Sequence, residues 1–134
     1  MTDEQPDTAT LGRILIDTLG KGWERTHTET ILSIFADDAV FHESPVGEPL
    51  VGKDALRQYW ADTPYHQADV KFSSGEIFVV GPWFSTEIKV TYRRRRTGEL
   101  VDTRGALFCE TNGERITEMR MYWHRTVARE AGYS

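Results

Sequence analysis

The second half of the chain constrains the fold most, because it consists of long alternating segments joined by tight-turn signals. From Phe84 to Tyr92 apolar and polar residues alternate, which is the period of a strand with one buried face. Gly81-Pro82, Thr97-Gly98 and Asn112-Gly113 are turn signals between such segments. Together these features predict an antiparallel meander. Its expected strands span residues 68–80 (with a bulge at 73–75), 84–92, 100–111 and 116–125.

The first half predicts three helices, because apolar residues recur there every three or four positions. Thr26 and Glu29 fit a capping box that would open the second helix, and Asp37-Asp38 would close it before a short strand over residues 39–44. Helices followed by a meander indicate an α+β domain, whose sheet would curl around a helix and leave a one-ended cavity. The expected buried stripes are Leu11, Leu15, Leu19 and Trp23, then Ile31, Leu32 and Phe35, then Leu56, Tyr59 and Trp60.

Length and composition exclude several classes of protein. The 134 residues suffice for one domain, which is expected over residues 9–128 between tails at 1–8 and 129–134. A net charge of −5 argues against a nucleic-acid partner, and no apolar run reaches the roughly 20 residues of a membrane span. The start lacks the pattern of a signal peptide, and the single cysteine, Cys109, cannot form an internal disulfide. The chain is therefore predicted to be cytoplasmic, with no metal and no cofactor.

Three segments carry a family resemblance that covers nearly the whole chain. They are residues 35–40 (FADDAV), 45–52 (PVGEPLVG) and 115–123 (RITEMRMYW). With these segments the chain resembles the NTF2-like superfamily, and within it the ketosteroid-isomerase and SnoaL-like group. The resemblance implies a cystatin-like cone, in which three N-terminal helices pack on a curved, mainly antiparallel sheet that encloses an apolar pocket. It also implies a small hydrophobic ligand and a homodimer formed through the outer sheet face.

The resemblance also points to catalytic positions. Ketosteroid isomerases place a catalytic Asp just before the Pro of a strand-to-loop junction. That position falls at Glu43 when counted from the segment FADDAV, and at Ser44 when counted back from Pro45. Chemistry favours Glu43, since a carboxyl group can move a proton near neutral pH. The family's two oxyanion donors fall at Leu19 and Ala106, so both donors are absent, and an acid–base reaction other than steroid isomerisation is expected.

Aromatic and apolar side chains are expected to line the pocket. The family's supporting Tyr on the third helix falls at Trp60, whose indole N–H can still donate a hydrogen bond, and its pocket Trp is kept as Trp123. Apolar walls such as Phe41 would penalise the charged form of the Glu43 carboxyl group and make it a better proton carrier. The expected ligand-binding residues are Leu19, Trp23, Phe41, Trp60, Ala106, Met121 and Trp123.

Asp102 and Arg104 form a second polar pair. They are two residues apart on an expected strand and so share a face. The family alignment places that face inward, where the pair could orient a polar group or stabilise an oxyanion. The opposite parity stays open, because Val101, Leu107 and Cys109 on the other face are apolar. The candidate catalytic residues are therefore Glu43, Asp102 and Arg104.

Three hypotheses about function follow. The first is a cofactor-independent acid–base enzyme, of isomerase, dehydratase, cyclase or hydrolase type, that acts on a small hydrophobic or aromatic molecule. The second is a carrier with the same pocket and no turnover. The third is an interaction domain that uses its outer sheet face, where Arg120, Tyr122 and His124 are expected. The run Arg93–Arg96 is interpreted as a solvated hairpin end. An enzyme requires Glu43 and a second polar group together in a pocket, whereas an interaction domain requires a filled cone.

Overall fold

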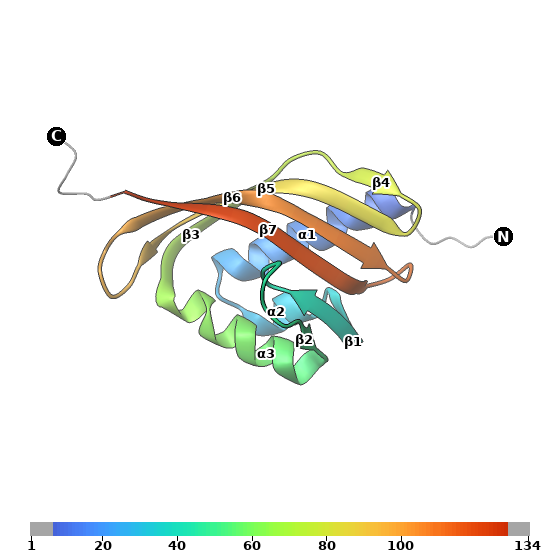
Figure 1. The fold of residues 1–134 in the computed structure, drawn as a ribbon, viewed down its shortest axis with the longest axis horizontal. Helices are drawn as coiled ribbons and strands as arrows, with labels where there is room; N and C mark the ends of the chain where they lie inside the picture. The colour runs from blue at the N-terminus through green and yellow to red at the C-terminus, as the bar shows by residue number, and fades with distance from the viewer. Residues whose placement is uncertain (1–6, 129–134) are drawn as a thin grey trace.

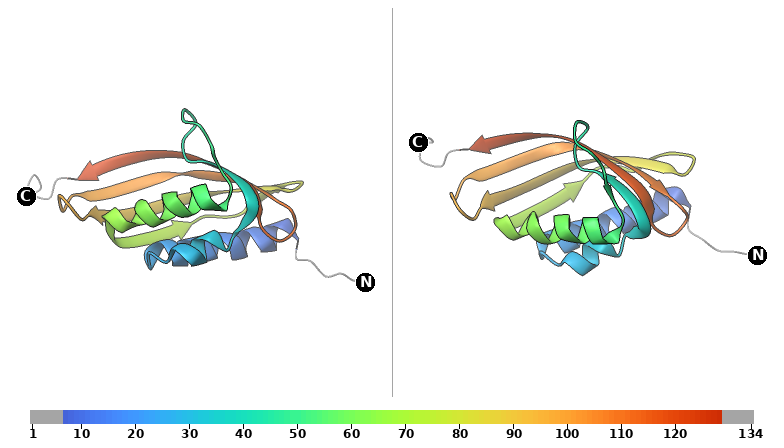
Figure 2. Two further views of the ribbon diagram at one scale, coloured as in Figure 1. Left: turned by 90° about the horizontal axis from the view of Figure 1, so that it is seen from below. Right: turned by 60° about the horizontal axis from the view of Figure 1, so that its bottom comes forward.

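One curved sheet covers a layer of three helices in the computed structural model, which describes residues 7–128 (Figure 1). All the helices lie on the concave face of the sheet, and the convex face carries none of them (Figure 2). The fold is thus the predicted α+β cone. The elements are α1 (Thr8–Glu24), α2 (Thr28–Leu32), β1 (Phe35–His42), β2 (Leu50–Val51), α3 (Lys53–Asp62), η1 (Pro64–His66), β3 (Gln67–Ser74), β4 (Phe78–Val80), β5 (Trp83–Arg94), β6 (Leu100–Thr111) and β7 (Ile116–Ala128).

The sheet is mixed but mostly antiparallel. Its strand order is β2-β1-β7-β6-β5-β3, and β4 pairs with β5 outside this path. The long strands β5, β6 and β7 form the predicted meander, and only β1 runs parallel to its neighbour β7. The loop from β1 to β2 projects past the sheet, away from the helices (Figure 2). The chain therefore leaves the concave face just where β1 ends.

The first helix packs as its periodicity predicts. Its four expected apolar residues, from Leu11 to Trp23, are all buried. The Asp7 side chain caps the helix by accepting a hydrogen bond from the Thr10 amide at 2.8 Å. Gly20 lets the helix approach β3 closely, because a Cβ atom at that position would lie only 2.5 Å from the Phe72 ring. The core between α1 and the sheet is consequently tight on this side.

The second helix begins and ends differently from the prediction. His27, not Thr26, is its N-cap, and its Nδ1 accepts a hydrogen bond from the Thr30 amide at 3.2 Å. Thr26 adopts a φ of 50° in the connection after α1. Glu29 is drawn away from the expected capping box by Arg57 of α3, whose Nε lies 3.1 Å from its carboxylate. A tertiary ion pair therefore competes with the local cap.

Two strand predictions also need correction. Asp37 and Asp38 do not end a helix, since β1 already begins at Phe35 and includes both of them. The expected strand over 68–80 is split into β3 and β4, and its irregularity lies between Ala68 and Lys71, not at 73–75. Asp69 has a φ of 55° at this irregularity, which accounts for the shift in register.

The first helix starts at Thr8, inside the tail predicted for residues 1–8. Residues 1–6 and the predicted tail at 129–134 lie outside the described residues. None of the helices within residues 7–128 has both the length and the apolar composition needed to span a bilayer.

Candidate active site

A cavity of about 290 Å³ lies between the helices and the concave face of the sheet. Its walls come from the end of α1, from α3, from the end of β1 and from the long strands. This volume is at the low end of the range for ligand pockets, roughly 300–1,000 Å³. Twelve residues line it: Trp23, Glu43, Tyr59, Thr63, Gln67, Ile88, Val90, Tyr92, Thr103, Met121, Trp123 and Arg125.

Strand parity decides which residues of the meander reach the cavity. Thr103 of β6 is paired with Val90 of β5 and with Arg125 of β7, so these three side chains share the concave face. Gly105 comes next on the same face of β6, opposite Trp123. An added Cβ atom at Gly105 would lie 2.9 Å from the Trp123 Cβ and closer still to the backbone of β7. The backbones of β6 and β7 therefore approach so closely here that the position accepts only a glycine.

Glu43 follows directly on β1 and lies on the cavity wall, half-buried. The indole Nε1 of Trp123 donates a hydrogen bond to its backbone oxygen at 3.0 Å. This bond joins the end of β1 to the middle of β7, two segments that are far apart in the sequence. The backbone that carries the carboxyl group is thereby held against the cavity.

Tyr59 of α3 brings a phenol to the same cavity. Burial raises the pKa of Tyr59 well above its ordinary value, and the negative charge of Glu43 raises it further, while a hydrogen-bonding interaction with Thr63 acts in the opposite direction. The phenol therefore stays protonated and remains a hydrogen-bond donor throughout the physiological pH range. The cavity thus holds a carboxyl group and a neutral phenol among its lining residues.

Tryptophans form the apolar side of the site. Trp23 lines the cavity, and its Nε1 donates to the Gln67 side-chain oxygen at 2.8 Å in a buried hydrogen bond. Trp60 packs edge-on against Trp23, with 5.1 Å between the ring centroids. The Trp60 Nε1 is buried and has no hydrogen-bond partner among the described residues. An unsatisfied buried donor costs about 1–3 kcal/mol, so this indole is a free donor behind the cavity wall.

The structure separates the predicted ligand-binding residues other than Ala106 into two groups. Trp23, Met121 and Trp123 line the cavity. Leu19, Phe41 and Trp60 do not line it, since they are at most 1% exposed and lie in the hydrophobic core. These three residues were expected at the pocket surface, but they are packed in the core behind the residues that line the cavity. Trp60, for example, is covered by Trp23 and Tyr59.

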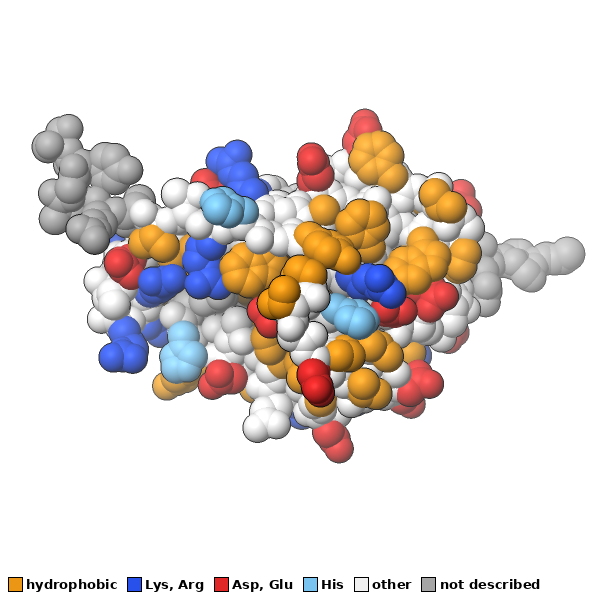
Figure 3. Space-filling model, in the orientation of Figure 1, with side chains coloured by type: hydrophobic (Ala, Val, Ile, Leu, Met, Phe, Trp, Pro, Cys, Tyr) orange, Lys and Arg blue, Asp and Glu red, His pale blue; other side chains and the backbone are white. Residues whose placement is uncertain are grey.

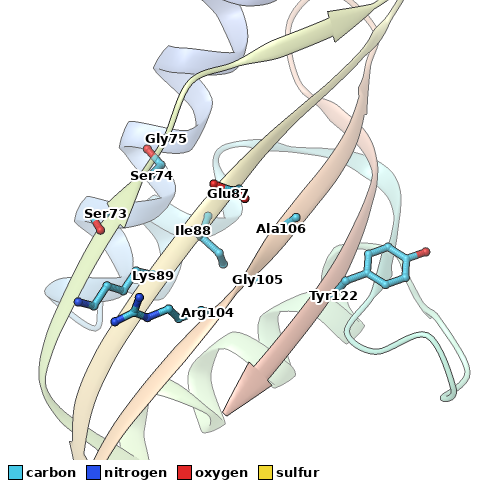
Figure 4. A pocket seen from close by; sticks show the side chains of 10 residues that line it. All are labelled: Ser73, Ser74, Gly75, Glu87, Ile88, Lys89, Arg104, Gly105, Ala106 and Tyr122. Atoms are coloured by element: carbon cyan, nitrogen blue, oxygen red, sulfur yellow. The ribbon is translucent and has the colours of Figure 1, made fainter. Parts of the chain in front are cut away.

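The inward placement of Asp102, Arg104 and Ala106 is wrong. Val101, Leu107 and Cys109 are the buried residues of β6, and the other parity faces out. Asp102 and Arg104 form an exposed ion pair on the convex face, where two guanidinium nitrogens of Arg104 donate to the carboxylate at 3.1 Å. Arg104 and Ala106 line a broad hollow of about 690 Å³ on that face (Figure 4).

The convex hollow is a poorer candidate site than the cavity. Figure 4 shows Lys89 and Arg104 side by side on β5 and β6, on the side of the sheet away from the helices. The strand backbones and exposed side chains form it, and no helix closes it. A ligand there would remain in water, whereas the inner cavity removes apolar surface from water.

Sequence reasoning missed several polar residues of the cavity. Tyr59 was assigned only to a buried stripe, and the open alternative for the parity of residues 101–109 would have indicated Thr103. Nothing local in the sequence marks the remaining residues, because their elements meet only in the folded chain. The polar residues added by the structure are Tyr59, Thr63, Gln67, Tyr92, Thr103 and Arg125. Within residues 7–128, no group of three or more His, Cys, Asp or Glu side chains is arranged to hold a metal ion.

A helical layer and a curved sheet with an internal cavity define the class of cone-shaped α+β domains. The family of SnoaL-like domains matches residues 18–119, and the chain belongs to this family. A search of curated protein sequences found no match. The predicted relation to the NTF2-like superfamily is thereby confirmed.

Solved structures of low sequence identity share the fold. The Δ5-3-ketosteroid isomerase from Mycobacterium sp. is 17% identical, with 88% of this chain and 98% of that one covered and a TM-score of 0.75. SalBIII, an epoxide hydrolase/cyclase-like enzyme of pyran ring formation in salinomycin, is 15% identical over 91% and 98%, with a TM-score of 0.78. A Mycobacterium tuberculosis protein in complex with estradiol-17β-hemisuccinate is 19% identical over 87% and 98%, with a TM-score of 0.74.

Proposed function

We propose that this protein binds a small hydrophobic or aromatic molecule in the inner cavity and carries out cofactor-independent acid–base chemistry on it. The observation that carries the proposal is that the Glu43 carboxyl group and the Tyr59 phenol line the same cavity, close enough for the charge of Glu43 to raise the pKa of Tyr59. The phenol is the second polar group that an enzyme requires beside its base. The reaction is of the isomerase, dehydratase, cyclase or hydrolase type.

Each residue has a defined role in this proposal. Glu43 takes a proton from the substrate, and the Trp123 indole holds the backbone of Glu43 in place. The Tyr59 O–H stabilises the oxygen on which negative charge develops. Trp23, Met121 and Trp123 bind the apolar body of the substrate. Tyr59 thus replaces the oxyanion donors that are missing at Leu19 and Ala106.

The names of the structural relatives are compatible with this proposal. They include an isomerase, a cyclase-like enzyme and a protein in complex with a steroid ester. These relatives support a small-molecule pocket, but at identities of 15–19% they show the fold alone and do not select a reaction type. The reaction here is therefore argued from Glu43 and Tyr59 and not from the relatives.

A carbon acid with a coloured product tests the role of Glu43 directly. In 5-nitrobenzisoxazole, removal of the ring C–H proton breaks the N–O bond and gives a nitrile and a coloured phenolate. We expect the protein to accelerate this ring opening over buffer, and Glu43→Gln to lower the acceleration by about 10²-fold or more. Ser44→Ala is the matched control, because it tests the other position allowed by the family alignment. A folded Glu43→Gln variant with unchanged rate, judged by circular dichroism, would contradict the proposal.

The carrier hypothesis is the second candidate, and the same cavity supports it. A carrier would bind a neutral aromatic probe such as N-phenyl-1-naphthylamine and leave the ring opening of 5-nitrobenzisoxazole at the buffer rate. Probe fluorescence and the rate assay together decide between the two functions. Binding without acceleration favours the carrier, and binding with Glu43-dependent acceleration favours the enzyme.

We also propose the predicted homodimer through the convex sheet face. Phe108 and Tyr122 stack edge-to-face there, with 5.7 Å between the ring centroids, although each is more than 40% exposed. Arg120 lies over the Trp83 ring beside them, at 5.8 Å. Sedimentation equilibrium of the wild type and of Tyr122→Glu tests this proposal, since a new carboxylate in the interface should leave monomers. The cytoplasmic location stays a prediction from the sequence.

A further inference from the structure

A second hollow, of about 620 Å³, adjoins the mouth of the cavity. We call it the vestibule. It shares Thr63, Gln67, Tyr92 and Arg125 with the cavity, so the two spaces meet along these four residues. Its remaining wall comes from the end of α3, from η1 and from the hairpin between β5 and β6. These further residues are Asp62, His66, Arg94, Arg96 and Thr97.

The vestibule carries more positive than negative charge, in a chain whose net charge is −5: three arginines line it, and Asp62 is its one carboxylate among the described residues. Arg94 is neutralised by Glu99, with 2.8 Å between guanidinium nitrogen and carboxylate oxygen. Arg96 and Arg125 are exposed and make no ion pair with any of the described residues. Figure 3 shows Lys and Arg side chains gathered at the end of the molecule where this hairpin lies. Two arginines thus remain available for an anion beside the cavity mouth.

Arg125 is held at the boundary between the two spaces. Its guanidinium carbon lies 4.7 Å from the centroid of the Trp123 ring, which is a cation–π contact. Trp123 in turn lines the cavity and is tied to Glu43 through its indole. A positive charge therefore lies directly next to the apolar space in which the body of a ligand would bind. Arginine also suits planar or tetrahedral oxyanions, because its donors are arranged as a fork.

The negative charge of Glu43 and the positive charge of the vestibule arginines would together set the orientation of a charged ligand. Glu43 lines the cavity and does not line the vestibule, whereas Arg96 lines the vestibule and not the cavity. A ligand with an anionic group would be repelled by Glu43 if that group entered the cavity, and attracted by the arginines if it stayed outside. The same two features would point the reactive part of the ligand toward Glu43.

We infer that the natural ligand is amphiphilic: its apolar body fills the cavity, and an anionic substituent is held in the vestibule by Arg96 and Arg125. The substituent is a carboxylate, a sulfate ester or a phosphate ester, which offer the same acceptor oxygens to arginine. This inference rests on the proposed function, because it assigns the class of ligand for the same cavity. It changes the interpretation of the arginine run from a solvated hairpin end to part of the site.

Two fluorescent probes test the inference, because they differ only in the anionic group. 8-Anilinonaphthalene-1-sulfonate carries a sulfonate on the body of N-phenyl-1-naphthylamine, and both become fluorescent in apolar sites. Their dissociation constants are measured for the wild type, for Arg96→Gln and for Arg96→Gln/Arg125→Gln. We expect the double variant to bind the sulfonate about tenfold more weakly. Arg96→Gln alone leaves the cavity lining intact, and it should weaken the sulfonate while binding the neutral probe within about twofold of the wild type. Salt should weaken only the sulfonate in the wild type.

Two matched variants test whether the sulfonate is held in the vestibule itself. Arg115→Gln removes one positive charge at the β6–β7 turn, at the other end of the sheet, and should leave both constants unchanged. Phe108→Ser alters the exposed aromatic patch on the convex face and should also leave them unchanged if the probes bind inside. An equal loss for Arg115→Gln would show a general effect of charge and overturn the inference.

The outcomes distinguish this inference from the proposed function. If the neutral probe binds the wild type but the sulfonate shows no dependence on Arg96 and Arg125, the anion site is wrong while the cavity stands. If neither probe binds, or if Phe108→Ser abolishes the binding of both, cavity binding itself fails and the inference fails with it. Weaker binding of the sulfonate probe in the double variant, with the neutral probe still bound, supports both the anion site and the binding cavity.

Discussion

The two faces of the meander carry the same strands but opposite chemistry. On the concave face, β6 contributes Val101 and Leu107 to the core and Thr103 to the cavity. On the convex face the residues between them, Asp102 and Arg104, pair with each other in water. The polar Thr103 on the inner face lines the cavity, whereas Asp102 and Arg104 on the outer face are solvated and pair with each other.

This difference teaches how to weigh a charged residue in a strand. Asp102 and Arg104 carry charges that Thr103 lacks. Their position in β6 nevertheless places them on the convex face, away from the cavity. Glu43 is a single carboxyl group beyond the end of β1, and it reaches the cavity together with Tyr59. Position relative to the two faces, and not residue type, therefore decides which groups can act on a ligand.

The largest effect should come from truncating neighbouring residues that face opposite ways. Leu107 is fully buried, and Phe108 is 43% exposed. We expect Leu107→Ala to lower the free energy of unfolding by about 2–5 kcal/mol, and Phe108→Ala by roughly 1 kcal/mol. Urea denaturation of both variants measures the difference. Equal losses would mean that the two faces of β6 are buried alike, and the comparison would fail.

Tyr59→Phe should come next, with an effect on rate. It removes only the phenol oxygen from the inner cavity. A lost hydrogen bond to a charged group costs about 1.5–3 kcal/mol, so we expect the ring opening of 5-nitrobenzisoxazole to slow by about tenfold to a hundredfold. Tyr122→Phe is the control, since it makes the same change on the convex face. If both variants keep the wild-type rate, Tyr59 is not the oxyanion donor.

Alkaline pH should lower the stability of the fold in two steps, first through Cys109 and then through Tyr59. Burial raises the pKa values of the Cys109 thiol and the Tyr59 phenol, so the folded state keeps both protons after the unfolded state has lost them. Stability is therefore full at neutral pH. It falls above about pH 8.5 for Cys109 and above about pH 10 for Tyr59, each by up to about 1.4 kcal/mol per pH unit. Unfolding curves across this range should show a shallower decline for Cys109→Ala and Tyr59→Phe.

The smallest effect is expected at the convex ion pair. Asp102→Asn and Arg104→Gln should change neither the urea midpoint nor the binding of N-phenyl-1-naphthylamine measurably, because the pair is exposed and screened by solvent. Fluorescence titration provides the test. A clear loss of binding in either variant would restore these residues to the site and contradict the parity seen in β6.

Much of the fold could be predicted, because its signals are local. The four-residue spacing from Leu11 to Trp23 specifies a helix with one buried side, and the turn at Asn112-Gly113 specifies a hairpin. The predictions failed where distant residues intervene. Arg57 takes Glu29 away from its cap, and the irregularity at Asp69 shifts the register of β3.

The sequence by itself determined an α+β domain of the SnoaL-like family and predicted Glu43 as its catalytic position. Only the tertiary structure decided which polar groups join Glu43. A shift of one residue moves every side chain of a strand to the other face. Thr103 therefore lines the cavity, and Asp102 and Arg104 do not. Tyr59 and Arg125 meet Glu43 because α3, β7 and the end of β1 converge, and no local pattern records that convergence.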